Sequence, residues 1–417
     1  MRSIRTLLAL SVAGTLAACG GDTGPQTVGS VAPPSGSPTP THSFVNPTEP
    51  KTYDGLGAVQ HYEYYTQSDG PAQGGQLYAG DANTVRDSGI SLTYNPRDAI
   101  FELTISRPKG LVSVEGFRFQ DPAHRTAFGG ASHPQSGVPD LSGKLNGIQY
   151  LETGSASGNL LPGASPYASR GLGTGRSDYD VGADGYSSTR QTFFYQKPGT
   201  TTKYVTYAGF VRNSVSASLQ QPADPAAPQE LRETYSLDRA AFVFGERTAN
   251  AAIPKTGSGT FDGDMLASIV FNPSLDINAA APSYLQWMAG TSHTTIDFAS
   301  GVVKTDLAGS VFAPTLDAYT SGNGGLAANS TFSAYADSTI DIINKGGFTG
   351  QFGCAAFNGA CVRGGAAPTG ALNVAGSSLD GAFFGPNGEE IGGGFRIVGG
   401  TPDQRIDILG AYTGAKK

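Results

Sequence analysis

Charged residues and histidines are scarce in this chain of 417 residues. Asp, Glu, Lys and Arg make up 15% of the sequence, and the formal net charge is −7 at pH 7. No basic stripe runs along the chain, which argues against nucleic acid as a partner and against polybasic attachment to anionic lipid. No Gly-x-Ser-x-Gly, phosphate-loop, His-Glu-x-x-His or dinucleotide motif occurs. We therefore expect a binding or structural protein and not an enzyme.

Long apolar runs are also missing, and the apolar segment near the N-terminus is too short to span a membrane. Two arginines precede the run 7–13, and Leu16-Ala17-Ala18-Cys19 follows it. A spanning helix needs about 20 apolar residues, so we interpret residues 1–18 as a signal peptide. The sequence Leu-Ala-Ala-Cys resembles the bacterial lipobox, which implies cleavage before Cys19 and lipid on its sulfur. By the same resemblance, Gly20 after the cysteine permits transfer to the outer membrane.

Cysteine is rare, with three residues in the whole chain. With Cys19 assigned to lipid, Cys354 and Cys361 remain, in an envelope compartment where thiols are oxidised. Asn358 and Gly359 supply a turn between them, so a hairpin would bring the two sulfurs within reach and we expect a local disulfide. A metal or redox site of the CxxC type is the alternative, but the spacing differs and no histidine lies near.

Glycine, by contrast, is abundant at 59 residues, and aromatic residues stand at 10%. Aromatic and β-branched residues fill pleated surfaces and glycine supplies tight turns, so the composition indicates an all-β chain. Residues 19–50 are rich in Gly, Pro, Ser and Thr and are predicted to form a disordered tether. Alternating apolar residues at 90–94 and 101–105, on either side of the turn 95–98, predict a hairpin with one buried face. The polar stretch 121–184 shows little periodicity and is interpreted as a long loop.

A loop-like segment near 248–257 separates two strand-rich regions. We therefore expect a β-rich handle domain at 51–247 and a second domain at 248–417. In the second region, short strand patterns separated by Gly, Asn or Asp turns follow one another from 259 to 412. This is the pattern of an antiparallel meander that can close into a barrel. Only the segment around 283–288 looks helical.

The run 379–395 reads Leu-Asp-Gly-Ala-Phe-Phe-Gly-Pro-Asn-Gly-Glu-Glu-Ile-Gly-Gly-Gly-Phe. It resembles the closing signature of the β-barrel domain of the transferrin-binding protein B family, in which a Gly-x-Phe-Tyr-Gly-Pro-Asn turn is followed by an acidic residue, an apolar one and Gly-Gly. Residues 257–263, Gly-Ser-Gly-Thr-Phe-Asp-Gly, are similar to the start of that barrel. Gly-Pro-Asn-Gly reverses the chain between two strands, and Phe383 or Phe384 would then fill the barrel interior. The detailed match is confined to about the last 170 residues.

This resemblance implies an all-β fold in which the handle packs against an eight-stranded antiparallel barrel. It also implies a lipid-anchored protein of the outer membrane, on the cell surface of a Gram-negative bacterium. There it would capture a host or environmental iron or haem source for a TonB-dependent transporter. The chain has one handle and one barrel, which departs from the two-lobed members that bind transferrin; single-lobed relatives include haem- and haemoglobin-binding lipoproteins. A surface adhesin or structural display lipoprotein is the alternative.

Two groups of residues are candidates for binding haem or its iron. The run His61, Tyr62, Tyr64 and Tyr65 offers an imidazole and phenols of the type that ligate haem iron. An ordinary aromatic strand is the other interpretation of this run. His124 and His133 lie in the long irregular stretch, where binding functions tend to sit. The other interpretation of His124 and His133 is that they are solvated loop histidines.

Three carboxylates in the same stretch are of the type that binds calcium. Asp178, Asp180 and Asp184 lie in a Gly-rich segment, but Gly182 stands where an EF-hand loop needs its third ligand. We therefore expect a solvated turn, and no metal site is predicted.

Overall fold

The computed structural model describes a chain of β-strands with short connections. The residues it describes are 47–67, 73–78, 88–106, 114–120, 135, 137–141, 147–158, 184–197, 199, 201–273, 284–313, 325–400 and 404–417. For β2 beyond residue 61, and for β3, only the backbone is described. The predicted signal peptide, Cys19 and nearly all of the predicted tether lie outside these residues.

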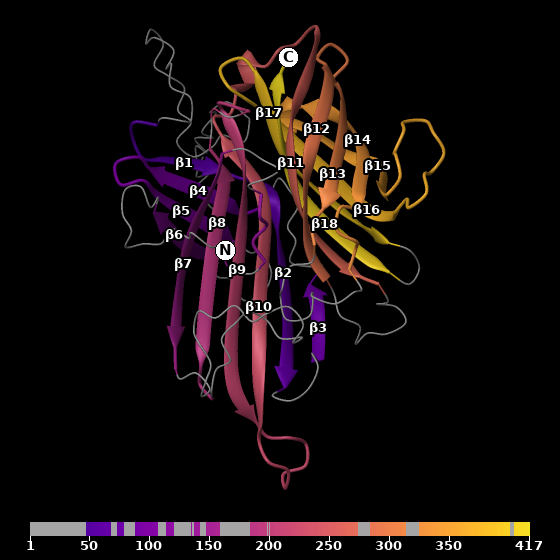
Figure 1. Cartoon of the computed structure of the whole chain (residues 1–417). Coiled ribbons are helices and arrows are strands. Elements are labelled where there is room, and N and C mark those ends of the chain that lie inside the picture. Colours follow the sequence, from indigo (N-terminus) through magenta and orange to yellow (C-terminus); the bar gives the residue numbers. More distant parts are fainter. Residues whose placement is uncertain are drawn as a thin grey trace, which may run out of the picture.

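The handle consists of strands β1–β10 in two sheets (Figure 1). The four-stranded sheet has the order β1-β4-β5-β6, with β1 at Lys51–Asp54, β4 at Ile90–Asn95, β5 at Ile100–Ser106 and β6 at Val114–Gln120. The six-stranded sheet has the order β3-β2-β10-β9-β8-β7, with β2 at Leu56–Gln67, β3 at Gln73–Tyr78, β7 at Ile148–Ser157, β8 at Ser187–Gln196, β9 at Val205–Gln220 and β10 at Glu230–Gly245.

The remaining eight strands, β11–β18, form a closed antiparallel barrel. They are β11 at Ser258–Asn272, β12 at Tyr284–Asp297, β13 at Val302–Val311, β14 at Thr331–Asp341, β15 at Gly347–Phe357, β16 at Asn373–Phe384, β17 at Glu390–Gly400 and β18 at Arg405–Lys416. Among the described residues, the helical elements are a 3-10 turn at Asn250–Ala252 and α1 at Ile342–Lys345. Within the described residues, no helix has the length and apolar character needed to traverse a bilayer.

The predicted all-β fold with an eight-stranded barrel is thus confirmed. The predicted hairpin is also present, because β4 and β5 pair from Ile90↔Ile105 to Asn95↔Ile100 around the expected turn. The division of the chain at residues 247 and 248 stays a prediction.

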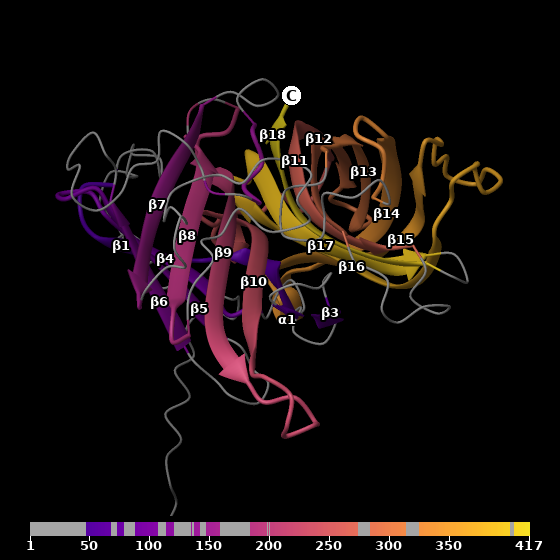
Figure 2. The same ribbon diagram turned by 60° about the horizontal axis from the view of Figure 1, so that its bottom comes forward.

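Parts of β2, β8, β9 and β10 are buried on both faces of the six-stranded sheet, and this burial joins the handle to the barrel. In β10, Phe242 and Phe244 pack into a cluster with the four-stranded sheet, whereas Ala241 and Val243 pack into a cluster with the barrel wall. Successive side chains of a strand point to opposite faces, so this alternation assigns one face to each neighbour. Two views show the sheet between its neighbours, with the barrel beyond β10 and β2 (Figures 1 and 2).

The barrel interior is filled by side chains from all eight strands. Phe383 of the closing signature lies in this cluster, while its neighbour Phe384 lies in the cluster against the handle. Of the two candidates from the sequence, Phe383 is therefore the one that fills the interior. Gly381 and Gly393 leave room for this packing, since a Cβ on Gly393 would lie 2.0 Å from the carbonyl oxygen of Asp380.

The helix expected at 283–288 is wrong, because this segment begins strand β12. Tyr284 and Met288 face the barrel interior, whereas Leu285 and Trp287 face outward into clusters with the handle. A strand that is apolar on both faces loses the alternation that marks a strand in sequence. The loop expected at 121–184 is also wrong in part, since it contains β7.

We predict that Trp287→Ala lowers the free energy of unfolding by about 3–5 kcal/mol, the usual cost of removing a buried Trp side chain. Trp287 is 1% exposed, packs edge-on against the Phe194 ring of the handle and donates a hydrogen bond from Nε1 to the Gly137 carbonyl (2.7 Å). Urea unfolding followed by circular dichroism measures the loss. The control is Ile343→Ala, which removes a side chain that is 76% exposed. A loss equal to that of the control would contradict the packing described.

Candidate functional site

His61 of the haem-ligand candidates lies in a buried row of polar side chains across three strands. Strand register places His61 of β2 opposite Asp238 of β10, and Asp238 opposite Arg212 of β9. His61 Nδ1 lies 2.7 Å from one carboxylate oxygen of Asp238, and Arg212 pairs with the other. Asp238 is fully buried and His61 is 8% exposed. In this row, His61 and Arg212 each contact one oxygen of the buried Asp238 carboxylate inside the handle.

The side chains of the other candidates lie outside what the structure describes. Tyr62, Tyr64 and Tyr65 follow it on the backbone of β2, and their side chains are not described. His124 and His133 lie outside the described residues. The described residues contain no group of three or more His, Cys, Asp or Glu side chains placed to hold a metal ion. The role of the six candidate residues in binding haem stays a prediction.

Glu390 is a residue whose role the sequence did not single out. Its carboxylate accepts hydrogen bonds from the backbone N–H groups of Lys203 (2.6 Å), Tyr204 (2.8 Å) and Val205 (3.1 Å). Val205 begins β9 of the handle and the other two residues directly precede it, whereas Glu390 begins β17 of the barrel. Burial raises the pKa of the Glu390 carboxyl, although the three N–H donors act in the opposite direction. The closing signature therefore carries a handle-to-barrel clamp.

Backbone contacts reinforce this clamp. The N–H of Thr248 donates to the Phe383 carbonyl (2.9 Å), and its hydroxyl donates to the Gly385 carbonyl (2.6 Å). The Gly385 N–H in turn donates to the Glu246 carbonyl (2.9 Å). The Gly-Pro-Asn-Gly turn thus holds the segment that leads from the handle into the barrel, and its residues are structural.

The barrel wall is incompletely paired between β15 and β16. Their ladder covers three residue pairs, Phe348↔Gly381 to Gly350↔Leu379, while every other neighbouring pair of barrel strands is joined over nine or more. β15 and the segment that leads into β16 pair again at the bridge Ala356↔Ala371. We call the stretch between these points, 351–355 on one side and 372–378 on the other, the window; the Leu372 N–H donates a hydrogen bond to the Ala355 carbonyl (2.8 Å) at one end of it.

The window opens into a cavity of about 640 Å³. Its lining comes from Tyr335 of β14, both edges of the window and the connection from β15 to β16. All of the lining residues are uncharged, and most are small. This is the cavity that the described structure offers as a candidate binding site.

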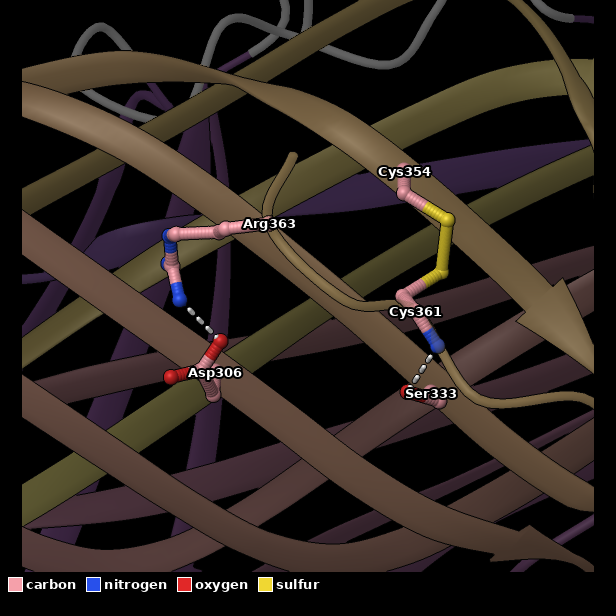
Figure 3. Close-up of a disulfide and its surroundings, with 5 residues drawn as sticks. All are labelled: Asp306, Ser333, Cys354, Cys361 and Arg363. Carbon is pink, nitrogen blue, oxygen red and sulfur yellow. Dashed lines mark hydrogen bonds and ion pairs between the residues drawn. A yellow bond between two sulfur atoms is a disulfide. The ribbon is translucent and has the colours of Figure 1, made fainter. Parts of the chain in front are cut away.

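The connection beside the window, residues 358–372, is fastened to the outside of the barrel. The predicted disulfide between Cys354 and Cys361 is present, with a Cα–Cα distance of 5.8 Å (Figure 3). Arg363 pairs with Asp306 of β13 and with Asp337 of β14, and its guanidinium carbon lies 4.7 Å from the centre of the Tyr335 ring. The backbone N–H of Cys361 donates to the Ser333 hydroxyl (3.1 Å). A covalent bond and an ion-pair network therefore fix this edge of the site.

Comparison with known proteins gives limited information. No protein-family model matches the chain, and no curated protein matches it either. Its structure matches solved structures of transferrin-binding protein B. One is a tryptophan-to-alanine mutant of the vaccine antigen from Haemophilus parasuis Hp5 (TM-score 0.29, 13% identity, covering 87% of this chain and 76% of that one).

Two further structures give similar values. They are intact Ap-TbpB with its N and C lobes (TM-score 0.27, 13% identity, 89% and 80% covered) and the isotype 1 protein of serogroup B Neisseria meningitidis (TM-score 0.25, 10% identity, 89% and 77% covered). All three TM-scores are below 0.5, so these matches establish neither the family nor the function of this chain.

We predict that Glu390→Gln lowers the free energy of unfolding by about 1–3 kcal/mol at pH 7, since an amide cannot accept all three backbone N–H groups. The pKa of Glu390 is raised on folding, so its contribution to stability falls as the pH rises through the folded-state pKa. The wild type should therefore gain stability relative to the variant as the pH falls from 7 towards 4.5, the ordinary value for this carboxyl.

Urea unfolding at pH 7 and pH 5 tests this pH dependence. Glu389→Gln is the matched control, because the adjacent carboxylate bonds within its own turn, to the N–H (2.8 Å) and Nδ2 (2.9 Å) of Asn387. A difference between wild type and Glu390→Gln that shrinks at the lower pH would disprove the assignment.

Proposed function

We propose that this chain is an outer-membrane surface lipoprotein that binds an extracellular iron source and passes it to a TonB-dependent transporter. The source would be haem, a haem protein or a transferrin-like protein. The lipobox at Cys19 and the signature at 379–395 support the location and the general class. The observation that carries the binding role is the window, an uncharged cavity in the wall of an otherwise paired barrel.

The chemistry of the window favours a protein over haem or a metal ion as the molecule bound there. A haem site needs a broad apolar pocket and an axial ligand such as His, Cys, Met or Tyr. The cavity is lined by seven Gly and Ala residues, by the polar residues Gln351, Asn373 and Ser377, and by a few larger apolar residues, which are Phe352, Val362, Leu372 and Val374. Tyr335, the phenol among the lining residues, lies against the guanidinium of Arg363. Small polar residues and exposed backbone suit contacts with another polypeptide.

For the anchor, we predict that Cys19→Ser abolishes incorporation of labelled palmitate and releases the chain from the membrane fraction. A hydroxyl cannot replace the thiol that accepts the lipid in the lipobox reaction. The control is the double variant Cys354→Ser with Cys361→Ser, which removes the disulfide and should stay labelled and membrane-bound. Labelling of Cys19→Ser equal to the wild type would refute the anchor.

For the ligand, we predict that the purified full-length chain binds at least one of haem, haemoglobin and transferrin with a micromolar or lower Kd. Biolayer interferometry measures binding of the two proteins, and absorbance in the Soret region measures binding of haem. Iron limitation should raise expression of the chain in its native host. The proposal is contradicted if none of the three binds and if expression does not change under iron limitation. The alternative function, a surface adhesin or display lipoprotein, would then be favoured.

A further inference from the structure

Short turns gather at one end of the barrel. They are 298–301 between β12 and β13, 342–346 between β14 and β15, and 385–389 between β16 and β17. The segment 246–257, which leads from the handle into β11, reaches the barrel at the same end, because β11 begins opposite the last residue of β12. We call this the short-turn end. Longer connections, such as 358–372, lie at the other end of the barrel.

The short-turn end exposes aliphatic side chains. Ile343 in α1 is 76% exposed and Val302 at the start of β13 is 39% exposed, which makes two of the four large hydrophobic side chains exposed among the described residues. Val302 pairs with Thr339 of β14, and the Gly301 carbonyl accepts the N–H of Ile340 (2.8 Å), so this turn adjoins the strand that runs into α1. Smaller apolar residues are also exposed at this end, namely Ala249, Ala251, Ala252, Ala299 and Pro386.

Packing within the barrel does not require an isoleucine at position 343. The neighbouring Ile342 packs against the barrel core, so one aliphatic side chain of α1 already covers this end. The N–H of Gly346 donates to the Ile342 carbonyl (3.1 Å), and Gly346 has a φ of +63°, so this glycine ends the turn. A polar residue at 343 would serve the same turn. Grouped apolar side chains that stay exposed mark a surface that meets another phase or molecule.

The folded chain begins close to the short-turn end. Lys51, the first residue of β1, forms an ion pair with Glu246 in the segment that leads into the barrel. The Glu246 carbonyl accepts the N–H of Gly385 in the turn 385–389 (2.9 Å). The predicted tether 19–46 therefore joins the folded part beside the short-turn end.

The predicted tether is short compared with the molecule. A strand rises about 3.3 Å per residue, so β10 carries the tip of the hairpin of β9 and β10 about 50 Å from the short-turn end. As a coil, 19–46 would span about 30 Å on average. Figure 1 shows this hairpin and the C-terminus, which lies at the short-turn end, at opposite ends of the molecule. Lipid on Cys19 therefore favours an orientation in which the short-turn end faces the bilayer.

We propose that the short-turn end is a lipid-contacting surface, which inserts Ile343 and Val302 between the headgroups and acyl chains of the bilayer that holds Cys19. This inference rests on the lipid anchor of the proposed function and goes beyond it, since it assigns the face that meets the membrane. The tether keeps this end at a high local concentration beside the bilayer, so a weak apolar contact is enough to orient the chain. Interfacial helices bury their apolar face about 5–10 Å into the same boundary.

Charged side chains at the short-turn end are compatible with this contact. Asp297 accepts hydrogen bonds from the N–H groups of Ala299 (2.9 Å) and Ser300 (3.2 Å), so its carboxylate is directed into its own turn. Lys417 pairs with Asp262. Lysine side chains are long enough to keep their ammonium groups among the lipid headgroups. Aliphatic side chains, and not a basic patch, therefore supply the affinity.

The test uses the mature chain from Cys19 with its disulfide intact, so that Cys19 carries the one free thiol. That thiol is coupled to a maleimide-bearing lipid in phosphatidylcholine vesicles, with or without bromine on the acyl chains. Bromine quenches tryptophan emission on contact. Trp287 is the single tryptophan of the wild type and is 1% exposed, so the wild type gives the baseline.

We expect brominated lipid to reduce the added emission of Ile343→Trp to about half, because the ring lies at the depth of the acyl chains nearest the headgroups. Val362→Trp is the matched control, since Val362 is 62% exposed on the connection 358–372 at the other end of the barrel. Its emission should be the same with and without bromine. Equal quenching of the two variants, or quenching of neither, would overturn the lipid-contacting surface.

Hydrogen exchange tests the native side chains. In the wild type, coupling to vesicles should slow exchange of the amides of 342–346 by about two-fold or more, because the bilayer covers the turn. Ile343→Asn should abolish this slowing, whereas Val362→Asn should retain it. Unchanged exchange of the wild type on vesicles would also contradict the surface.

Because the maleimide supplies the anchor, these measurements depend neither on acylation in the cell nor on an iron source. Absence of palmitate on wild-type Cys19 would reject the lipid anchor of the proposed function. Equal quenching of Ile343→Trp and Val362→Trp would reject the lipid-contacting surface even if palmitate labelling and haem binding succeed. The two failures are therefore distinguishable.

Discussion

Burial of both faces of the six-stranded sheet is the constraint on which the rest of the molecule depends. Phe210 and Phe242 cover one face with the four-stranded sheet, and Val205 and Val243 cover the other with the barrel wall. In this part of the sheet neither face meets solvent, so apolar side chains occupy both faces. Handle and barrel therefore share a core, and a cavity created at their contact destabilises both.

The same constraint explains where buried polar groups are found. At the edge of the apolar region, Asp238 is neutralised by His61 and Arg212, and at the barrel contact Glu390 receives three backbone N–H groups. An isolated carboxylate in either place would cost several kcal/mol, so each is fully partnered. In the closing signature, Glu390 thus serves the contact between barrel and handle.

The sequence predicted what depends on local pattern and missed what depends on pairing. The hairpin of β4 and β5 has one buried face and was predictable, whereas β12 was not, because Trp287 and Met288 are apolar on opposite faces. The disulfide followed from the turn at Asn358 and the export signal. The sequence held one signal for Glu390. It is the second of two adjacent acidic residues in the signature, and it directly precedes the apolar Ile391. The window was unpredictable, because it arises from the register between β15 and β16.

The window also differs from the ordinary end of a strand. Barrels remove exposed edges by closing, and an edge that stays open usually invites aggregation. Here the opening is bounded by paired residues on both sides and by a connection fastened through Cys361 and Arg363. The disulfide and the ion pairs therefore hold the barrel wall together where the ladder between β15 and β16 covers only three residue pairs.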